Sequence, residues 1–529
     1  MSLEEFLYNL HFHIEKVQPP NFKVDWDDGP LPYKLYRGLP VFPLSSDVPL
    51  TLESKEPMHS KQPDTRQMGH FLWYVYGLTQ LSQSVISLDS AGPALGTIQT
   101  FRRFVPSGGA LYPSEVYVYL KVEDLPFGVY HYDAAHHRLV LLREGNFDAY
   151  LAQALGNHCD MSACFGSVFV STMFWKNFFK YHNFAFRLQG LDAGVLIGQL
   201  LEVAKRFGFE TGVHFRFLDR AVNHLLGLSE QEESVYAVIP LTVHPAAAWF
   251  ADSADEAGKP VTAAELCREL TPIHSEHYVQ SRRVREHPKL IKLNESSFLE
   301  SIPLFQSSAG EREIDSVSHT VALPRVDRLS YDLALASRKR YSPGTNFIPG
   351  SISQFQLATL LHETMASFSY RSDLDEWNKN PKQRVLLYGC IHGVEDVPSG
   401  AYRYDSAMHA LLQLRPGDHR DRLQQGMSLY NVNLFQVPVC LHIAGNRDSL
   451  LPVLGYRGYR IQQMEAGMLT QRLLLAASAI GLGGHPLLDF HTNTCDEIYK
   501  MASSEKTSLI QIPVGLYCPR PRLEGGLLG

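Results

Sequence analysis

The chain contains an internal repeat, and this repeat limits its possible folds more than any single motif does. GVYHYDAAHHRLVLLREG at 128–145 matches GAYRYDSAMHALLQLRPG at 400–417, an offset of about 272 residues. FRLQGLDAG at 186–194 matches YRIQQMEAG at 459–467, in the same order and at nearly the same offset. Two matches that keep their order and spacing predict two homologous domains.

Each domain is expected to be of the mixed α+β class. GVYHYD and GAYRYD have the alternation of paired strands, whereas LDAGVLIGQLLEVAKRFG and MEAGMLTQRLLLAASAIG carry apolar residues at helical spacing and end in glycine. Those two helices are too apolar for an exposed position. The polar segment 252–325 is long for a bare linker, so we expect a connector with a helix or two between domains at 1–251 and 326–529.

Composition excludes several classes of protein. A chain of 529 residues with 45% hydrophobic residues can form two or three globular domains, and its net charge of −7 without a basic cluster argues against nucleic acid as a partner. The N-terminus has acidic residues where a secretory signal would be basic, and no apolar run is long enough to span a membrane, so we expect a cytoplasmic protein. Seven cysteines without a CxxC pair suggest neither a metal site nor a disulfide framework.

A short flexible segment precedes one predicted strand. Pro106, Ser107, Gly108 and Gly109 stand just before VYVYL, and the two glycines allow positive φ and a close approach of the backbone to another group. An ordinary turn is one interpretation. A loop against a flat or anionic ligand is the other.

PSGGALYPSE, GVYHYD, a Lys-Tyr pair and the RLQGLDAG helix, in this order, resemble the SagB-type dehydrogenases. These form a branch of the FMN-dependent nitroreductase superfamily that oxidises azolines to azoles on peptides. The resemblance covers most of both halves, without the first 60 or so residues and the connector. It implies an FMN site between two subunits, in which one subunit binds the phosphate and the other offers a Pro-Ser-x-Gly loop to the flavin ring. A duplicated chain would form this dimer within itself, as a pseudo-dimer.

The two halves have lost different parts of such a site. Arg338, Lys339 and Arg340 resemble the family's phosphate-binding segment, but the second half has no PSGG sequence. The first half has PSGG, but no equivalent of the basic segment. The resemblance therefore predicts one FMN, with its phosphate on the second half and Pro106 to Gly109 against its ring. A solvated basic cluster at a helix end is the alternative for the three cations.

Further cofactor contacts are implied in the second half. Gly481, Gly483 and Gly484 follow the second apolar helix and would let backbone amides approach the flavin, although a helix C-cap alone explains Gly481. Arg520, in the closing segment, stands where the superfamily often has another phosphate ligand. A surface charge is equally compatible with its position.

Lys180 and Tyr181 are the catalytic candidates, because they match the Lys-Tyr motif of azoline oxidases and have no counterpart in the second half. Aromatising an azoline removes a hydride and a proton from adjacent carbons, and the proton needs a base within hydrogen-bond reach. A solvated lysine beside a core tyrosine is the alternative interpretation.

We therefore expect an FMN-dependent oxidoreductase that dehydrogenates azolines on a peptide or carrier-bound precursor. A cyclodehydratase or a synthetase is a candidate partner. Two other functions stay open at this point: an NAD(P)H-dependent nitro or quinone reductase on the same fold, and a non-catalytic partner subunit of a cyclising enzyme.

Overall fold

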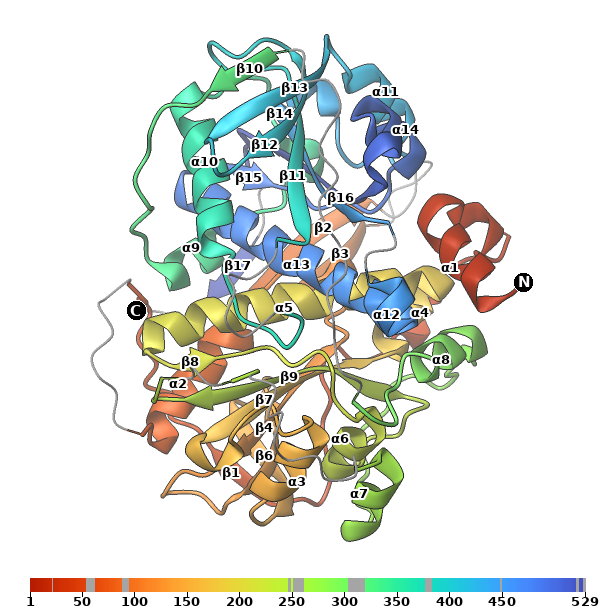
Figure 1. Cartoon of the computed structure of the whole chain (residues 1–529), viewed down its shortest axis with the longest axis vertical. Helices are drawn as coiled ribbons and strands as arrows, with labels where there is room; N and C mark the ends of the chain where they lie inside the picture. The colour runs from red at the N-terminus through yellow and green to blue at the C-terminus, as the bar shows by residue number, and fades with distance from the viewer. Residues whose placement is uncertain are drawn as a thin grey trace.

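The computed structural model describes the chain except residues 21, 54–61, 88–94, 246–248, 251–260, 303–318, 376–382, 448–449, 520–522 and 527–529. Its two halves each contain a seven-stranded antiparallel sheet, in the order β1-β6-β5-β4-β7-β9-β8 and β10-β13-β12-β11-β14-β16-β15. The strand order is the same in both sheets, and the predicted α+β fold with two homologous domains is confirmed (Figure 1).

The first sheet consists of β1 (Val41–Pro43), β4 (Ser114–Leu120), β5 (Gly128–Asp133), β6 (Arg138–Glu144), β7 (Gly166–Met173), β8 (Glu210–Thr211) and β9 (Glu233–Thr242). The second consists of β10 (His319–Ala322), β11 (Val385–Ile391), β12 (Gly400–Asp405), β13 (Ala410–Pro416), β14 (Val439–Asn446), β15 (Gly483–Gly484) and β16 (Lys506–Gly515). Even the irregularities repeat, since the register shifts at Val129/Tyr130 and at Ala401/Tyr402.

Two long helices, α5 (Ala185–Phe207) and α13 (Tyr456–Ala479), lie side by side between the sheets (Figure 1). They contain the two apolar segments predicted to be interior helices, and most of their side chains are buried. The flanking helices α2 (Thr65–Tyr76) and α10 (Gln354–Ser367) each begin with a capping box, at Asp64 and Ser353.

Glycines allow α5 and α13 to approach each other closely. A Cβ atom added at Gly194 would lie closer than 3.0 Å to the Met464 carbonyl group, and one at Gly467 would lie closer than 3.0 Å to the Leu191 carbonyl oxygen. The neighbouring atoms are backbone, which cannot move aside as the end of a side chain can. The interface between the two halves therefore depends on bare glycine backbones at this crossing.

Substitution of Gly467 tests this crossing. We expect Gly467→Ala to lower the free energy of unfolding by about 2 kcal/mol, because the added methyl group must separate two packed helices. Urea unfolding followed by far-UV circular dichroism measures the change. Gly525→Ala is the control, since a Cβ atom there meets nothing within 4 Å. Equal stability of the two variants would contradict the close packing.

The ends of the two halves cross over to each other. Helix α1 (Leu3–Phe12) contacts the second half, where the Thr492 hydroxyl donates to the His11 carbonyl at 3.2 Å. The predicted connector contains two helices, α7 (Ala263–Glu269) and α8 (Pro288–Glu295), and the segment after α8 returns to the first half through the Leu299 N–H, which donates to Asp219 at 2.8 Å.

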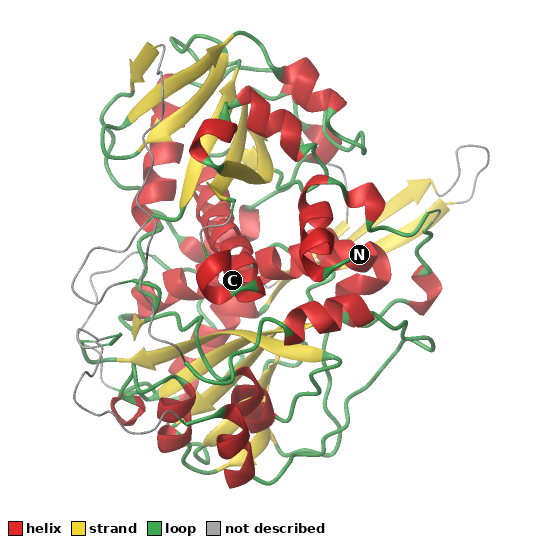
Figure 2. Cartoon of the chain, turned by 45° about the vertical axis from the view of Figure 1, so that its right-hand side comes forward, coloured by secondary structure: helices red, strands yellow, loops and turns green. Residues whose placement is uncertain are grey.

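A third sheet joins the halves. The hairpin β2 (Leu78–Ser87) and β3 (Leu95–Arg103) pairs with β17 (Leu523–Gly526), so the last strand of the second half lies on the hairpin of the first. Figure 2 shows this hairpin extending away from the body of the molecule. These exchanges are the arrangement expected of a dimer that has been fused into one chain.

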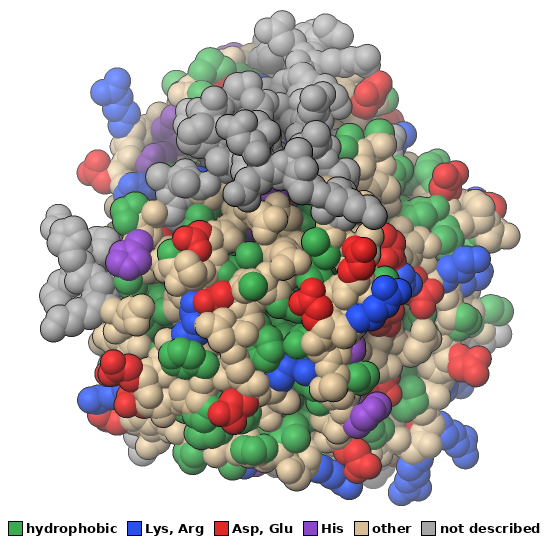
Figure 3. Space-filling model, turned by 60° about the horizontal axis from the view of Figure 1, so that its bottom comes forward, with side chains coloured by type: hydrophobic (Ala, Val, Ile, Leu, Met, Phe, Trp, Pro, Cys, Tyr) green, Lys and Arg blue, Asp and Glu red, His purple; other side chains and the backbone are tan. Residues whose placement is uncertain are grey.

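The remaining helices are short: α3 (Asp148–Ala154), α4 (Trp175–Tyr181), α6 (Asp219–Leu226), α9 (Leu333–Lys339), α11 (Arg420–Gln425), α12 (Leu451–Leu454) and α14 (Thr492–Ile498). On the face shown in Figure 3, acidic and basic side chains are interspersed rather than gathered by sign. Among the described helices, none is long and apolar enough to cross a bilayer.

Candidate active site

The Pro-Ser-Gly-Gly sequence lies in a constrained loop between β3 and β4. We call residues 106–112 the glycine loop. Gly109 has a φ of +65°, and the non-glycine residues Ala110 and Tyr112 also have positive φ, at 58° and 48°. Such values are uncommon outside glycine and need support from the surroundings. The glycine loop is therefore more strongly fixed than an ordinary turn.

Asp192, on α5, supplies part of that support. Its carboxylate accepts a hydrogen bond from the Ser107 hydroxyl at 2.6 Å and another from the Gly108 N–H at 3.1 Å. The Ser107 oxygen in turn accepts from the Tyr112 N–H at 2.9 Å. One side chain of the central helix thus holds both ends of the glycine loop.

The structure brings Lys180 and Tyr181 to the same loop. They end α4, and a Cβ atom added at Gly109 would lie 2.6 Å from the Lys180 amine and closer still to the Tyr181 hydroxyl. The Lys180 amine is also 5.2 Å from the centre of the Trp26 ring. In the second half, Val453 and Leu454 occupy the equivalent positions at the end of α12. The two helix ends can be aligned because the residue after α12 has nearly the same backbone conformation as the residue after α4.

Burial changes the protonation of the two candidates in opposite directions. It lowers the pKa of the Lys180 amine below its usual value, since the charged form is less well solvated there. Burial, together with the nearby Asp192 carboxylate, raises the pKa of the Tyr181 phenol. Lys180 is thus shifted toward a neutral amine that can accept a proton, whereas Tyr181 stays a neutral donor.

A buried network fixes α4 against the glycine loop. The Lys176 ammonium, one turn before Lys180, donates to the Tyr112 carbonyl at 3.3 Å and forms a short ion pair with Glu115. The Lys176 charge, together with a hydrogen bond from His131 at 2.9 Å, keeps the pKa of Glu115 well below its usual value. This network places the catalytic candidates relative to the loop.

The three predicted phosphate-binding cations differ in their surroundings. Arg340 is only 6% exposed, Arg338 is half-buried and donates to the Leu50 carbonyl at 2.9 Å, and Lys339 is exposed. The Arg102 guanidinium donates to the Arg340 carbonyl, so an arginine of each half meets there. A solvated cluster thus describes Lys339 but not Arg340.

Arg340 has the character of an anion-binding side chain. Burial and the charge of Arg102 lower its pKa to about 9, and none of the ion pairs among the described residues includes it. The Nε atoms of Arg338 and Arg340 are buried without a hydrogen-bond partner in the described part of the chain. Unpaired Nε donors on guanidinium groups that form no ion pair with another described residue fit a phosphate group.

The glycine turn lies next to this cluster. Gly481, at a φ of +78°, ends α13, and Gly483 and Gly484 form β15. A Cβ atom at Gly483 would lie 2.5 Å from Pro343, three residues after Arg340. Arg520 lies outside the described residues. The structure thus gathers most of the predicted cofactor residues at one boundary between the halves.

The corresponding turn of the first half packs against aromatic rings. The turn of the first half has Glu210 and Thr211 at the positions of Gly483 and Gly484. A Cβ atom at the following Gly212 would lie 2.6 Å from the Phe250 ring and 3.2 Å from Trp249, both of which are buried.

A segment that precedes β11 in the second half contacts the same turn. Asp373 accepts hydrogen bonds from the N–H groups of Phe215 and Arg216, at 3.0 and 2.7 Å. Its carboxylate also forms an ion pair with the Arg216 guanidinium, at 3.8 Å. Around this turn the described residues thus include an acid and two buried aromatic rings, where the first boundary has glycines and guanidinium groups.

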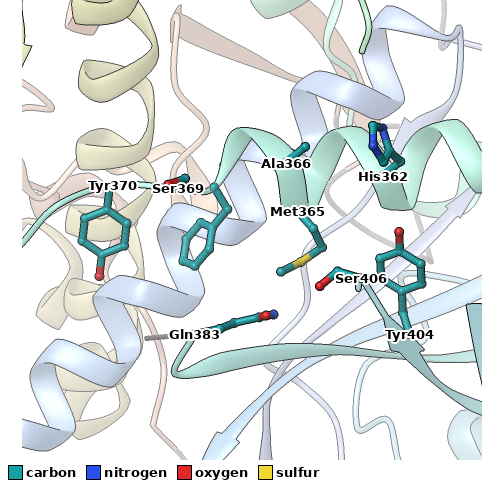
Figure 4. Close-up of a pocket in the computed structure, with 9 residues that line it drawn as sticks. His362, Met365, Ala366, Ser369, Tyr370, Gln383, Tyr404 and Ser406 are labelled. Atoms are coloured by element: carbon teal, nitrogen blue, oxygen red, sulfur yellow. The ribbon is translucent and has the colours of Figure 1, made fainter. Parts of the chain in front are cut away.

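Two described cavities lie apart from the site. One, of about 280 Å³, opens between α10 and β12 and is lined by His362, Met365 and Tyr404, among others (Figure 4). The other, of about 590 Å³, lies between α1 and the start of α13. No group of His, Cys, Asp or Glu among the described residues could hold a metal ion.

Several residues of the site were not predicted from the sequence. Asp192 had a visible signal, because an acid stands at the same position of both repeats, in LDAG and MEAG. Arg102 stands four residues before Pro106 and had no periodic signal. Trp26 lies in the first 60 residues, which carry no recognisable motif.

The chain is similar to several known proteins. The trifolitoxin-processing protein TfxB of Rhizobium leguminosarum bv. trifolii is 25% identical over 243 residues, which cover 44% of this chain and 61% of that protein. The predicted nitroreductase MJ1384 of Methanocaldococcus jannaschii is 29% identical over 129 residues, 24% of this chain and 63% of that protein. The matches thus span less than two thirds of either relative.

A solved structure matches nearly the whole chain. A predicted nitroreductase from Anabaena variabilis aligns with a TM-score of 0.71 at 20% identity, over 98% of this chain and 99% of that one, which shows a common fold. The model of the nitroreductase family matches residues 83–241 and 380–516, more than half of the chain and one region in each repeat. With a match in both halves and the same fold throughout, this chain belongs to the nitroreductase family, as a tandem duplication.

Proposed function

We propose that this protein is an FMN-dependent dehydrogenase that oxidises azolines to azoles on a peptide or carrier-bound precursor. The observation that carries the proposal is the half-buried Lys180 amine, which lies against Gly109 of the glycine loop and has a lowered pKa. Similarity to a protein named for processing trifolitoxin supports a role in the maturation of a natural product.

FMN would be held across the two halves. Arg338 and Arg340 of the second half would bind its phosphate, and Ser107 to Gly109 of the first half would lie against its ring. When bound, the flavin would supply the acceptor for the hydride, which is one hydrogen with its pair of electrons. The described residues fit this group because they offer buried guanidinium donors without an acidic partner.

A residue of the chain accepts the proton that the substrate loses. Oxidation of an azoline breaks two C–H bonds on adjacent carbons, and one hydrogen leaves as a proton while the other leaves with its electron pair. The neutral Lys180 amine accepts the proton, for which its lowered pKa suits it. The Tyr181 phenol, kept protonated by burial, orients the amine or the substrate through its hydroxyl group.

An NAD(P)H-dependent nitro or quinone reductase is the alternative on the same fold. Such an enzyme needs no base beside the flavin ring, because its product takes its proton from water. Loss of two hydrogens from a synthetic azoline peptide, with bleaching of the flavin in the absence of oxygen, is the expected result for the dehydrogenase. Oxidation of NADPH with a nitroaromatic compound, and no azole, would contradict it.

One FMN per chain is the expected stoichiometry. The symmetric second boundary contains the Asp373 carboxylate and the rings of Trp249 and Phe250, so among the described residues one boundary offers a glycine loop facing a phosphate-binding cluster. Denaturing the purified protein and measuring the released FMN by absorbance tests this. Two FMN per chain would contradict the loss of the second site, and a colourless protein would favour a non-catalytic partner subunit.

A further inference from the structure

An acidic residue stands at the same position of both repeats and accepts hydrogen bonds from different partners in each. Asp192 and Glu465 stand on the central helices α5 and α13, in LDAG and MEAG. Each binds the segment that leads from a flanking helix to the central strand of its sheet. Asp192 accepts from Ser107 and Gly108, whereas Glu465 accepts from the Tyr370 hydroxyl at 2.5 Å and the Arg384 guanidinium at 2.7 Å.

The two acids differ in whether a cation balances the charge of the carboxylate. Glu465 forms an ion pair with Arg384, as expected of a buried carboxylate. Asp192 takes part in none of the ion pairs among the described residues, and only a hydroxyl and an amide compensate its charge. Burial raises the pKa of Asp192 to about 6, which means that its charged form is held at a cost. A half-buried acid whose surroundings disfavour its charged form, and which has no cation beside it among the described residues, is a poor choice for stability alone.

The partners of Asp192 point to its role. Ser107 and Gly108 directly precede Gly109, which lies against the Lys180 amine and the Tyr181 hydroxyl. The Ser107 oxygen also accepts from the Tyr112 N–H, at a residue with positive φ. A change in the position of the Asp192 carboxylate therefore moves the loop against which both catalytic candidates pack.

We propose that Asp192 is a positioning residue, which holds the glycine loop in the shape that receives the flavin ring and places Gly109 against Lys180 and Tyr181. This inference rests on the proposed function for the identity of the cofactor. In the second half the acid at the same position, Glu465, binds Tyr370 and Arg384 instead. The repeat thus retains one acidic anchor, which holds a different segment in each half.

Asp192→Asn tests the proposal. The Ser107 hydroxyl and the Gly108 N–H donate to different oxygens of the carboxylate, and the amide replaces one of these oxygens with an NH2 group that cannot accept, so we expect FMN to bind about tenfold more weakly. The visible circular dichroism of the bound flavin, which reports on the ring environment, should change while the unfolding temperature does not fall. Ser107→Ala should give a similar loss, and the double variant should lose clearly less than the product of the two single effects.

Glu465→Gln is the matched control, the same change at the same position of the other repeat. We expect it to retain the wild-type FMN affinity and flavin spectrum. Equal weakening in both variants would show general damage to helix packing, and wild-type binding in Asp192→Asn would remove Asp192 from the loop's support. Either result overturns the inference.

A measurement without flavin separates this inference from the proposed function. Hydrogen exchange of the FMN-free protein should be faster at the Gly108 and Tyr112 amides in Asp192→Asn than in the wild type. Unchanged exchange at both amides contradicts the inference even if the wild type binds FMN well. Failure of the wild type to bind FMN, with faster exchange in the variant, would instead contradict the proposed cofactor.

Discussion

Lys180→Ala is expected to lower the rate of azoline oxidation by about 10²- to 10⁴-fold, the usual contribution of a general base. The half-buried amine lies against the glycine loop, and its lowered pKa increases the fraction of neutral amine near pH 7. FMN should remain bound, because Lys180 is not among the residues assigned to the phosphate. Flavin reduction by a synthetic azoline peptide, without oxygen and in flavin-replete protein, measures the step directly.

The dependence on pH gives this prediction a second signature. A lysine acts as a base only after it loses its proton, so the wild-type rate should rise with pH and level off below the usual lysine pKa of 10.5. This rise should be absent in Lys180→Ala. Tyr181→Phe should lower the rate and keep the rise, because the phenol stays protonated throughout.

Lys16→Ala is the control for the lysine variant, since Lys16 is exposed on the segment that follows α1. We expect wild-type rates for it. Wild-type rates for Lys180→Ala as well would exclude the amine from the mechanism and leave a reductase without a base as the better reading of the site.

The duplicated fold could be predicted because the repeat is recognisable in short stretches of the sequence. The matching GVYHYD and GAYRYD strands and the two apolar helices keep their offset, and the structure places them at equivalent positions of two sheets with the same order. The exchange of ends between the halves could not be predicted in this way. It depends on long-range contacts, such as β17 on β2, which leave no periodic signal in either segment.

The site was predictable only in part, for a similar reason. The glycine loop and the Lys-Tyr pair have local signatures, but the burial of Arg340 beside the exposed Lys339 depends on how α9 meets Arg102 of the other half. The position of Trp249 and Phe250 against Gly212 likewise follows from tertiary packing, because neither ring belongs to a motif. Asp192 is the exception, since comparison of the two repeats alone would have marked it.

Arg338→Ala combined with Arg340→Ala is expected to weaken FMN binding by at least two orders of magnitude. A charge-assisted hydrogen bond to a buried phosphate contributes about 1.5 to 3 kcal/mol, and the Nε atoms of both arginines are buried without a partner among the described residues. Arg340→Ala alone should account for most of the loss, because Arg340 is the more buried of the two.

Equilibrium titration of the flavin-free variants with FMN, followed by flavin fluorescence, measures this loss. Lys339→Ala provides the comparison within the same helix, since its side chain is exposed and should contribute little. Removal of a buried cation also relieves the repulsion between Arg340 and Arg102, so the double variant should fold at least as stably as the wild type without FMN. A variant that is stable and yet retains full FMN affinity would place the phosphate elsewhere, because unfolding could not then explain the result.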